Sequence, residues 1–174
     1  MKFKLNFLIL LATFSLVACQ NDGGSTNEFN DEEIKELVID YSINDHNGEV
    51  ATITGTALTI TQSDGQEEVY QLPEDEFFVS IAPFLDNTHP CTYHSLTGCQ
   101  GEMIEQELNV YVEDQDGQVV IDQKMTTLAN GFIDLWLPRD QTYQITITHQ
   151  GKEAVSQIST FDNDATCITT MQLI

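Results

Sequence analysis

The chain has 174 residues, of which 41% are hydrophobic, which is enough for one compact domain or two small ones that share an interface. Its 28 acidic residues outnumber six lysines and arginines, so the formal net charge is −22 at pH 7. This balance argues against nucleic acid as a partner, because phosphate binding needs clustered Lys and Arg side chains.

The first 18 residues have the features of a targeting segment. Two lysines precede an apolar run that is short for a membrane-spanning helix, a pattern typical of a secretory signal peptide at 1–18. The run ends in Leu-Val-Ala-Cys, which resembles the bacterial lipobox and predicts a lipid on Cys19. We therefore expect an extracytoplasmic protein of the cell envelope that meets the membrane through its lipid anchor only. Cleavage near Ala18 without a lipid is the alternative.

A flexible tether is expected at 19–30, because its small polar residues cannot bury enough apolar surface to order the segment. A helix is predicted from Asn30 to Ser42. Four apolar residues fall on one stripe with the helical period: Ile34, Leu37, Val38 and Tyr41. Asn30 and Glu33 have the spacing of a capping box, which marks the start of this helix.

Short strands follow the helix. The stretch 51–62 is predicted to be one Thr- and Ile-rich strand with a bulge at Gly55, and 67–72 is its partner. A buried strand is expected at 77–82, where apolar residues run together before a proline. These segments define an N-terminal α+β region at 31–86.

The stretch 87–101 lacks periodicity and is predicted to be a loop that carries two cysteines. The remainder, 102–174, is predicted to be a C-terminal β-sandwich, because short alternating strands recur along it. These strands are expected at 107–113, 119–124, 132–137, 143–147, 154–161 and 167–173. The predicted fold class is thus α+β, mostly β, with a helix and a small antiparallel sheet before the sandwich. Phe132 and Trp136 are expected in the sandwich core, whose strand order resembles the prealbumin-like architecture; that likeness carries no function.

Three cysteines remain once Cys19 is assigned to the lipid, and an odd number is unusual for an exported protein. Cys91 and Cys99 lie in a turn-rich loop, and such a pair commonly forms a disulfide outside the cytoplasm. A loop this small contributes about 2–3 kcal/mol at most on a chain-entropy estimate. This interpretation leaves Cys167 without a partner.

A metal site accounts for more of these residues. Cys91 and His94 form a Cys-x2-His step that brings a thiolate and an imidazole to one ion, and Cys99 can fold back through the turn before it. On the predicted last strand, Cys167 and Met171 alternate onto one face, which places a thioether beside the third thiol. Such ligands suit a soft ion such as Cu(I), whereas zinc needs only the thiolates and the imidazole. The residues alone leave a disulfide and a metal site both open.

The other candidates are weaker. His89 precedes Pro90 and is a candidate outer group of the cysteine site. His46 and His149 belong to expected surface turns, and Met103 is expected in the core or at the rim of the site.

Four segments resemble the CueP family of exported copper-binding proteins: His89-Pro90-Cys91, Tyr93 to Glu102, Leu135 to Arg139 and Thr166 to Leu173. The resemblance covers most of the chain beyond the tether. It implies copper binding outside the cytoplasm, in copper tolerance or in handing copper to a client protein. It also implies a site formed by Cys91, Cys99 and Cys167, with His94 between the first two. One difference is the lipobox, since the family is associated chiefly with soluble periplasmic proteins.

The expected function is therefore that of an exported copper-binding lipoprotein, and not of an enzyme. It sequesters or transfers Cu(I) through three thiolates, with His94 assisting and Met171 peripheral. The alternative is an extracytoplasmic thiol redox or metal-reducing protein, in which Cys91 and Cys99 cycle between dithiol and disulfide. A third alternative is a structural surface module with an incidental disulfide, which requires Cys167 to lie far from the pair. The sequence contains no catalytic-triad, phosphate-loop or nucleotide fingerprint.

Overall fold

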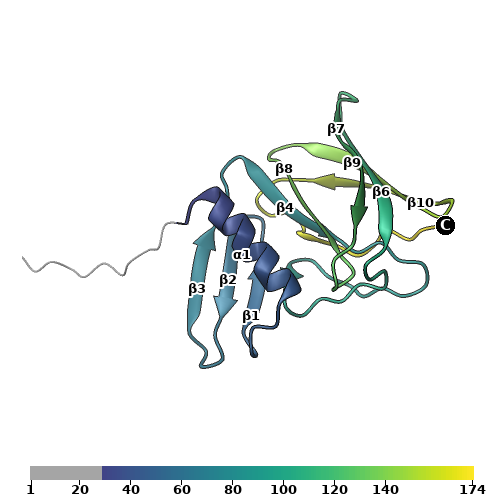
Figure 1. Ribbon diagram of the computed structural model, residues 1–174. Helices are drawn as coiled ribbons and strands as arrows, with labels where there is room; N and C mark the ends of the chain where they lie inside the picture. Colours follow the sequence, from purple (N-terminus) through teal and green to yellow (C-terminus); the bar gives the residue numbers. More distant parts are fainter. Residues whose placement is uncertain (1–28) are drawn as a thin grey trace, which may run out of the picture.

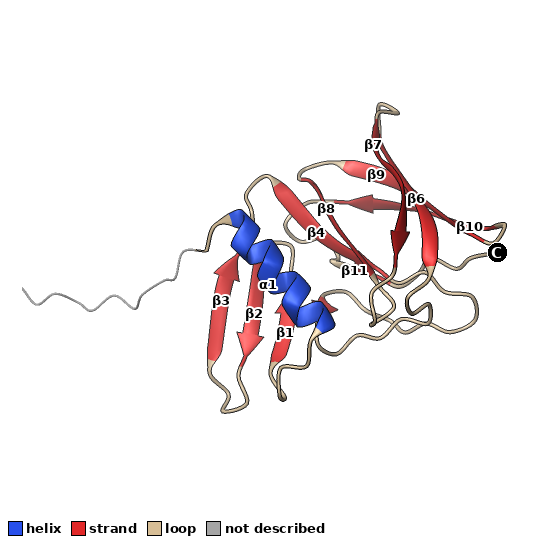
Figure 2. Cartoon of the chain, in the orientation of Figure 1, coloured by secondary structure: helices blue, strands red, loops and turns tan. Residues whose placement is uncertain are grey.

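One helix and eleven strands form the part of the chain that the computed structural model describes, residues 29–174 (Figure 1, Figure 2). In chain order they are α1 (Asp31–Ile43), β1 (Val50–Ile53), β2 (Ala57–Thr61), β3 (Glu67–Gln71), β4 (Glu76–Ile81), β5 (His94–Ser95), β6 (Glu107–Asp114), β7 (Val119–Thr126), β8 (Ile133–Pro138), β9 (Thr142–His149), β10 (Lys152–Ser159) and β11 (Cys167–Ile168). The predicted signal peptide at 1–18, the lipidated Cys19 and nearly all of the tether at 19–30 lie outside the described residues. Between residues 29 and 174, no helix has the length and apolar character needed to cross a bilayer.

The helix α1 begins where its capping box predicts. The Asn30 side chain accepts a hydrogen bond from the Glu33 backbone at 3.1 Å, and the Glu33 carboxylate accepts one from the Asn30 backbone at 2.8 Å. The apolar stripe buries Ile34, Val38 and Tyr41 against the rest of the protein. The prediction of a helix here is confirmed.

Four strands form the N-terminal sheet in the order β3-β2-β1-β5, and α1 lies across it (Figure 1). The single strand predicted at 51–62 is wrong, because β1 and β2 are separate strands that pair antiparallel. The hydroxyl and backbone of Thr54 both bond to Ala57 and close the turn between them. Gly55 is not a bulge. A Cβ atom there would lie 2.3 Å from the carbonyl oxygen of Asp162, so only glycine fits this close approach.

The three-stranded sheet β11-β4-β8 lies between two hydrophobic cores, because successive side chains of a strand point to opposite faces. Phe77 and Leu135 belong to the core shared with the sandwich, whereas Phe78 and Trp136 pack with α1 and the N-terminal sheet. The assignment of Trp136 to the sandwich core is therefore wrong. Its neighbours Leu135 and Leu137 occupy the face toward that core, which leaves Trp136 on the other face.

The sheet β10-β9-β6-β7 packs on the central sheet and completes the sandwich. The alternating residues of β6 and β9 are buried as predicted at 107–113 and 143–147. Facing residues of the shared core are Leu108, Val110, Val112, Tyr143, Ile145 and Ile147 on one sheet, and Phe77, Val79, Ile81, Ile133, Leu135 and Leu137 on the other. The fold is α+β and mostly β; the narrower likeness to prealbumin stays a prediction. The predicted boundary after residue 86 also stays a prediction, and β4 pairs across it with β8.

The last segment is mostly irregular, although a strand is predicted at 167–173. Within it, Cys167 and Ile168 form β11, which pairs parallel to β4. The expected alternation of Cys167 and Met171 along one strand does not occur, since the strand ends after Ile168. Met171 packs in the sandwich core. Phe132 packs with Ala82 and Cys167 in a separate cluster, so its assignment to the sandwich core is wrong.

Candidate metal centre

A long loop between β4 and β6 carries Cys91 and Cys99, and its middle is fixed to the N-terminal sheet. The short strand β5 pairs with β1, which places His94 opposite Ile53. After β5 the backbone of Cys99 donates a hydrogen bond to the carbonyl oxygen of Ser95 at 3.0 Å. The chain therefore turns back at this point and brings Cys99 toward Cys91.

Two glycines position the end of this loop. Gly101 donates a backbone hydrogen bond to the carbonyl oxygen of Asn130 at 2.7 Å. Gly101 and Gly131 cross so closely that a Cβ atom on either would lie 2.6 Å from the carbonyl oxygen of the other. Gly131 also has φ of 81°, a conformation that L side chains rarely adopt. The crossing holds the loop beside Phe132, which follows Gly131.

Glu102 fixes the start of the loop. Its carboxylate accepts backbone hydrogen bonds from Leu85 at 2.6 Å and Asp86 at 3.0 Å, and a side-chain bond from Asn87 at 3.2 Å. The bonds from Asp86 and Leu85 hold the pKa of Glu102 below its ordinary value of 4.5, because they stabilise the ionised carboxylate. Both ends of the cysteine loop are therefore tied to the framework.

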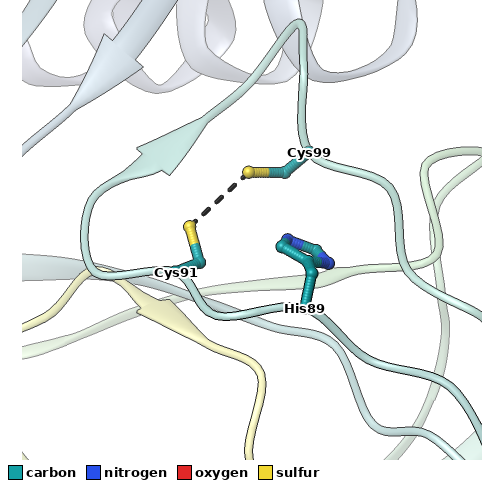
Figure 3. Close-up of side chains that lie close together, drawn as sticks. All are labelled: His89, Cys91 and Cys99. Atoms are coloured by element: carbon teal, nitrogen blue, oxygen red, sulfur yellow. Dashed lines mark hydrogen bonds between the residues drawn. The ribbon is translucent and has the colours of Figure 1, made fainter.

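The structure brings the three described cysteines together. The sulfurs of Cys91 and Cys99 lie 3.6 Å apart and point toward each other (Figure 3). The sulfur of Cys167 lies 3.5 Å from Nδ1 of His94. Ligand atoms of His94, Cys99 and Cys167 all lie within 4.8 Å of one another. The same holds for His89, Cys91 and Cys99, so two groups of three meet at Cys99, and Cys167 is not remote as the surface-module alternative requires.

Thr166 ties β11 to the loop. Its hydroxyl accepts a hydrogen bond from the His94 backbone at 3.0 Å and donates one to the carbonyl oxygen of Ile53 at 2.6 Å. The backbone nitrogens of Thr166 and Cys167 both donate to the carbonyl oxygen of Thr92, at 3.0 and 3.1 Å. The sequence does not single out Thr166, because these bonds join segments that are far apart in the chain.

Each of the two histidines near the sulfurs has one buried ring nitrogen without a hydrogen bond. Nε2 of His89 and Nε2 of His94 are buried side-chain atoms with no partner among residues 29–174. An unsatisfied buried polar atom costs about 1–3 kcal/mol. The residues present fit a soft metal ion, because imidazole and thiol ligand atoms meet within 4.8 Å in each of the two groups. His89, which the sequence suggests as an outer group of the site, shares this feature with His94.

The site has a buried side and an accessible side. His94 is fully buried, with its ring centroid 4.4 Å from that of Phe132, and Cys167 is 2% exposed. Cys91 and Cys99 are half-buried. Water is therefore excluded from the His94–Cys167 side, while Cys91 is within reach of solvent.

The three thiols differ in acidity. A hydrogen bond from the Cys167 thiol, helped by His94, holds the pKa of Cys99 well below its usual range. The same hydrogen bond, together with burial, raises the pKa of Cys167. Burial is the main cause that raises the pKa of Cys91. Because the thiolate is the form that binds metals, this arrangement presents a thiolate at Cys99 with two protonated thiols beside it.

The weaker sequence candidates lie elsewhere in the described chain. Met103 packs in the sandwich core. His46 stacks on Tyr41 with ring centroids 3.8 Å apart, and Nδ1 of His149 lies 2.9 Å from the carbonyl oxygen of Glu107. The three cysteines and His94 are therefore brought together as the sequence predicts, and their role as ligands stays a prediction.

Comparisons with known proteins find one matching family and a similar solved structure. Residues 33–172 match the family described as periplasmic copper-binding protein CueP. The crystal structure of S.CueP is similar to this chain, with a TM-score of 0.77 and 35% sequence identity over 81% of this chain and 88% of that chain. No curated protein matches the sequence.

Proposed function

The chain belongs to the CueP family of periplasmic copper-binding proteins, and on this premise we propose that it binds copper as Cu(I) outside the cytoplasm. The proposed ligands are the thiolates of Cys91, Cys99 and Cys167, with His94 assisting. The observation that supports them is that a ring nitrogen of His94 lies within 4.8 Å of the sulfurs of Cys99 and Cys167, while the sulfurs of Cys91 and Cys99 lie 3.6 Å apart. Thiolates and imidazole together suit a soft ion such as Cu(I).

The proposed role of this binding is to sequester copper or to pass it to a client protein. Cys91 and Cys99 are half-buried, so a thiolate or thioether of a partner can approach the metal from their side. Copper would then move by exchange of one thiolate at a time, and never as a free ion. Such a protein supports copper tolerance when it holds the ion and copper delivery when it releases it.

The proposed attachment to the membrane is the lipid on Cys19, and the net charge of −22 disfavours direct binding to an anionic membrane surface. Membrane fractionation of cells that express the wild-type or the Cys19→Ser chain tests this attachment. Equal membrane association of the two proteins would contradict it.

Copper binding is tested with the full chain, reduced and kept without oxygen. Cu(I) is shared between the protein and a coloured Cu(I) chelator, and the absorbance of the chelator complex gives the affinity. We expect tight binding by the wild type and its loss when Cys91, Cys99 and Cys167 are all replaced by Ser. His149→Gln is the matched control and should bind as the wild type does. Absence of Cu(I) binding, or unchanged affinity in the triple variant, would show that the proposal is wrong.

Redox activity is the second candidate, and the 3.6 Å separation of the Cys91 and Cys99 sulfurs favours it. A low thiol pKa at a half-buried cysteine is typical of a reactive thiol. In this alternative the two thiols form a disulfide and release two protons, and the two electrons reduce two Cu(II) ions to Cu(I). Thiol titration after adding Cu(II) or Cu(I) without oxygen separates the candidates. Loss of two thiols with Cu(II) supports the redox role, whereas retention of all three supports binding alone.

A further inference from the structure

The possible ligands around Cys99 form two sets that differ in depth. We name His94, Cys99 and Cys167 the inner set, and His89, Cys91 and Cys99 the outer set. Within each set the ligand atoms lie no more than 4.8 Å apart, so each can surround one ion. Cys99 belongs to both sets.

Burial separates the two sets. In the inner set, His94 is fully buried and Cys167 is 2% exposed, so an ion there would be shielded from solvent. In the outer set, His89 and Cys91 are half-buried. An external copper donor or acceptor can therefore approach the outer ligands, while the inner ligands are covered.

His89 has the chemistry of a ligand at the outer set. In Figure 3 its ring lies beside the facing sulfurs of Cys91 and Cys99. Its Nε2 is buried and has no hydrogen-bond partner in the part of the chain that the structure describes. Its ring packs edge-on against Phe132, with centroids 6.4 Å apart. One ring nitrogen of His89 lies within 4.8 Å of both sulfurs, so all three can bind one metal ion.

We propose that copper occupies two positions in turn: it enters and leaves at the outer set, where His89 is a ligand, and it is retained at the inner set. This inference rests on the proposed copper binding and deepens it. Cys99 stays bound in both positions, so the ion is not released during the move.

The move between the sets is a ligand exchange without electron transfer. Going inward, Cu(I) keeps its bond to Cys99, loses those to Cys91 and His89, and gains bonds to Cys167 and His94. The proton displaced from the Cys167 thiol passes, directly or through solvent, to the Cys91 sulfur. Bonds, protons and charge therefore balance, and the reverse sequence releases the ion.

Equilibrium and rate measurements separate the two positions. The full chain, reduced and loaded with Cu(I), is mixed with an excess of a coloured Cu(I) chelator, and the affinity and the transfer rate are both recorded. We expect His89→Gln to slow transfer about 10-fold or more and to leave the affinity almost unchanged, because it removes a ligand of the outer position only. We expect His94→Gln to weaken the affinity about 10-fold or more, within the range seen when groups beside a metal are lost. His149→Gln is the matched control and should change neither quantity.

A spectroscopic measurement tests His89 directly. In the Cys167→Ser chain the inner set is incomplete, so Cu(I) should stay at the outer set. X-ray absorption of this protein should show two sulfur neighbours and one imidazole, and the imidazole should disappear on adding His89→Gln but not on adding His94→Gln. Circular dichroism of each variant checks that it is folded.

The outcomes distinguish this inference from the proposed function. If the wild type binds no Cu(I), both are wrong. If it binds Cu(I) but His89→Gln alters neither the transfer rate nor the imidazole signal, only the two-position inference is wrong. Equal loss of affinity in His89→Gln and His94→Gln would also overturn it, since that result indicates one site that uses both histidines.

Discussion

At the scale of single residues, Cys99 has the central place in the site. Its sulfur lies 3.6 Å from the sulfur of Cys91. It also belongs to the inner set, with Cys167 and His94. Hydrogen bonding from its neighbours keeps its pKa low, so the ligand that would hold the metal in either position is already a thiolate. Cys91 and Cys167 each belong to one group, and each has a raised pKa.

Single cysteine replacements should therefore have unequal effects. Cys99→Ser should weaken Cu(I) affinity about 100-fold or more, whereas Cys91→Ser should weaken it far less, because the inner group remains complete. For comparison, replacing a group that only contacts a metal ligand typically lowers metal affinity about 10–100-fold. Competition with a Cu(I) chelator under anaerobic conditions measures them, and thermal unfolding of each apo variant serves as the folding control. Equal losses for the two replacements would contradict the central place of Cys99.

At the scale of elements, the loop between β4 and β6 owes its shape to bonds at its ends rather than to regular structure. Glu102 accepts two backbone hydrogen bonds from the start of the loop, and the Gly101–Gly131 crossing fixes its end. The two-residue strand β5 adds a tie to β1 in the middle. A loop with three fixed points can hold its thiols in place without a disulfide.

The Glu102 contacts make part of the stability depend on pH. The folded pKa of Glu102 lies below its ordinary value of 4.5, so the stabilisation is present above that value and is lost as the pH falls through the folded pKa. Glu102→Gln should lower the free energy of unfolding by about 1 kcal/mol near neutral pH, because charge-assisted bonds to the backbone become neutral ones. Urea denaturation across the acid range should show the difference between the wild type and the variant shrinking as the pH falls below 4.5 and through the folded pKa of Glu102.

A matched control for this measurement is Glu36→Gln, which alters an exposed acid on α1. It should leave the pH dependence as it is in the wild type. If the difference in unfolding free energy between the wild type and Glu102→Gln grew as the pH fell, that result would contradict the role of these bonds.

At the scale of the whole molecule, Arg139 joins the loops of the N-terminal sheet to the sandwich. Its guanidinium donates to the carbonyl oxygens of Pro73 at 3.1 Å and Gly55 at 2.6 Å, and it lies over the ring of Phe77 at 5.6 Å. The ion pair with Asp162 contributes little to the stability of the fold, since the Asp162 side chain is 69% exposed. Together with the shared strand β4, this side chain connects the two cores on opposite faces of the central sheet.

Arg139→Ala should therefore lower the free energy of unfolding by about 2 kcal/mol, because it leaves two carbonyl oxygens without their donor. The Cu(I) affinity should remain that of the wild type, since Arg139 is in neither ligand group. Urea denaturation and chelator competition measure the two quantities. Lys152→Ala, which removes an exposed cation from β10, is the control and should change neither. If Arg139→Ala lost Cu(I) affinity but not stability, Arg139 would be shown to support the copper site and not the connection between the two cores.

Local patterns in the sequence account for much of the fold. The capping box predicts the start of α1, and the alternation of apolar residues predicts the strands β6 and β9, because both depend on neighbours within a few positions. The loop with Cys91 and Cys99 is also evident from its lack of periodicity. The same patterns failed at 51–62, where a continuous Thr-rich run hides the turn that Thr54 and Ala57 close between β1 and β2.

By itself, the sequence determined the fold class and the CueP resemblance, because residue identity and short-range spacing carry that information, and the resemblance led to the prediction of a site at the three cysteines and His94. Only the tertiary structure decided three placements. Trp136 faces the N-terminal core, Met171 packs in the sandwich core, and a ring nitrogen of His89 lies within 4.8 Å of the sulfurs of Cys91 and Cys99. The physical reason is that these placements depend on which face of a shared sheet meets which core, and on contacts between distant segments. The pairing of β11 with β4, which carries Cys167 to His94 from 73 residues away, is such a contact.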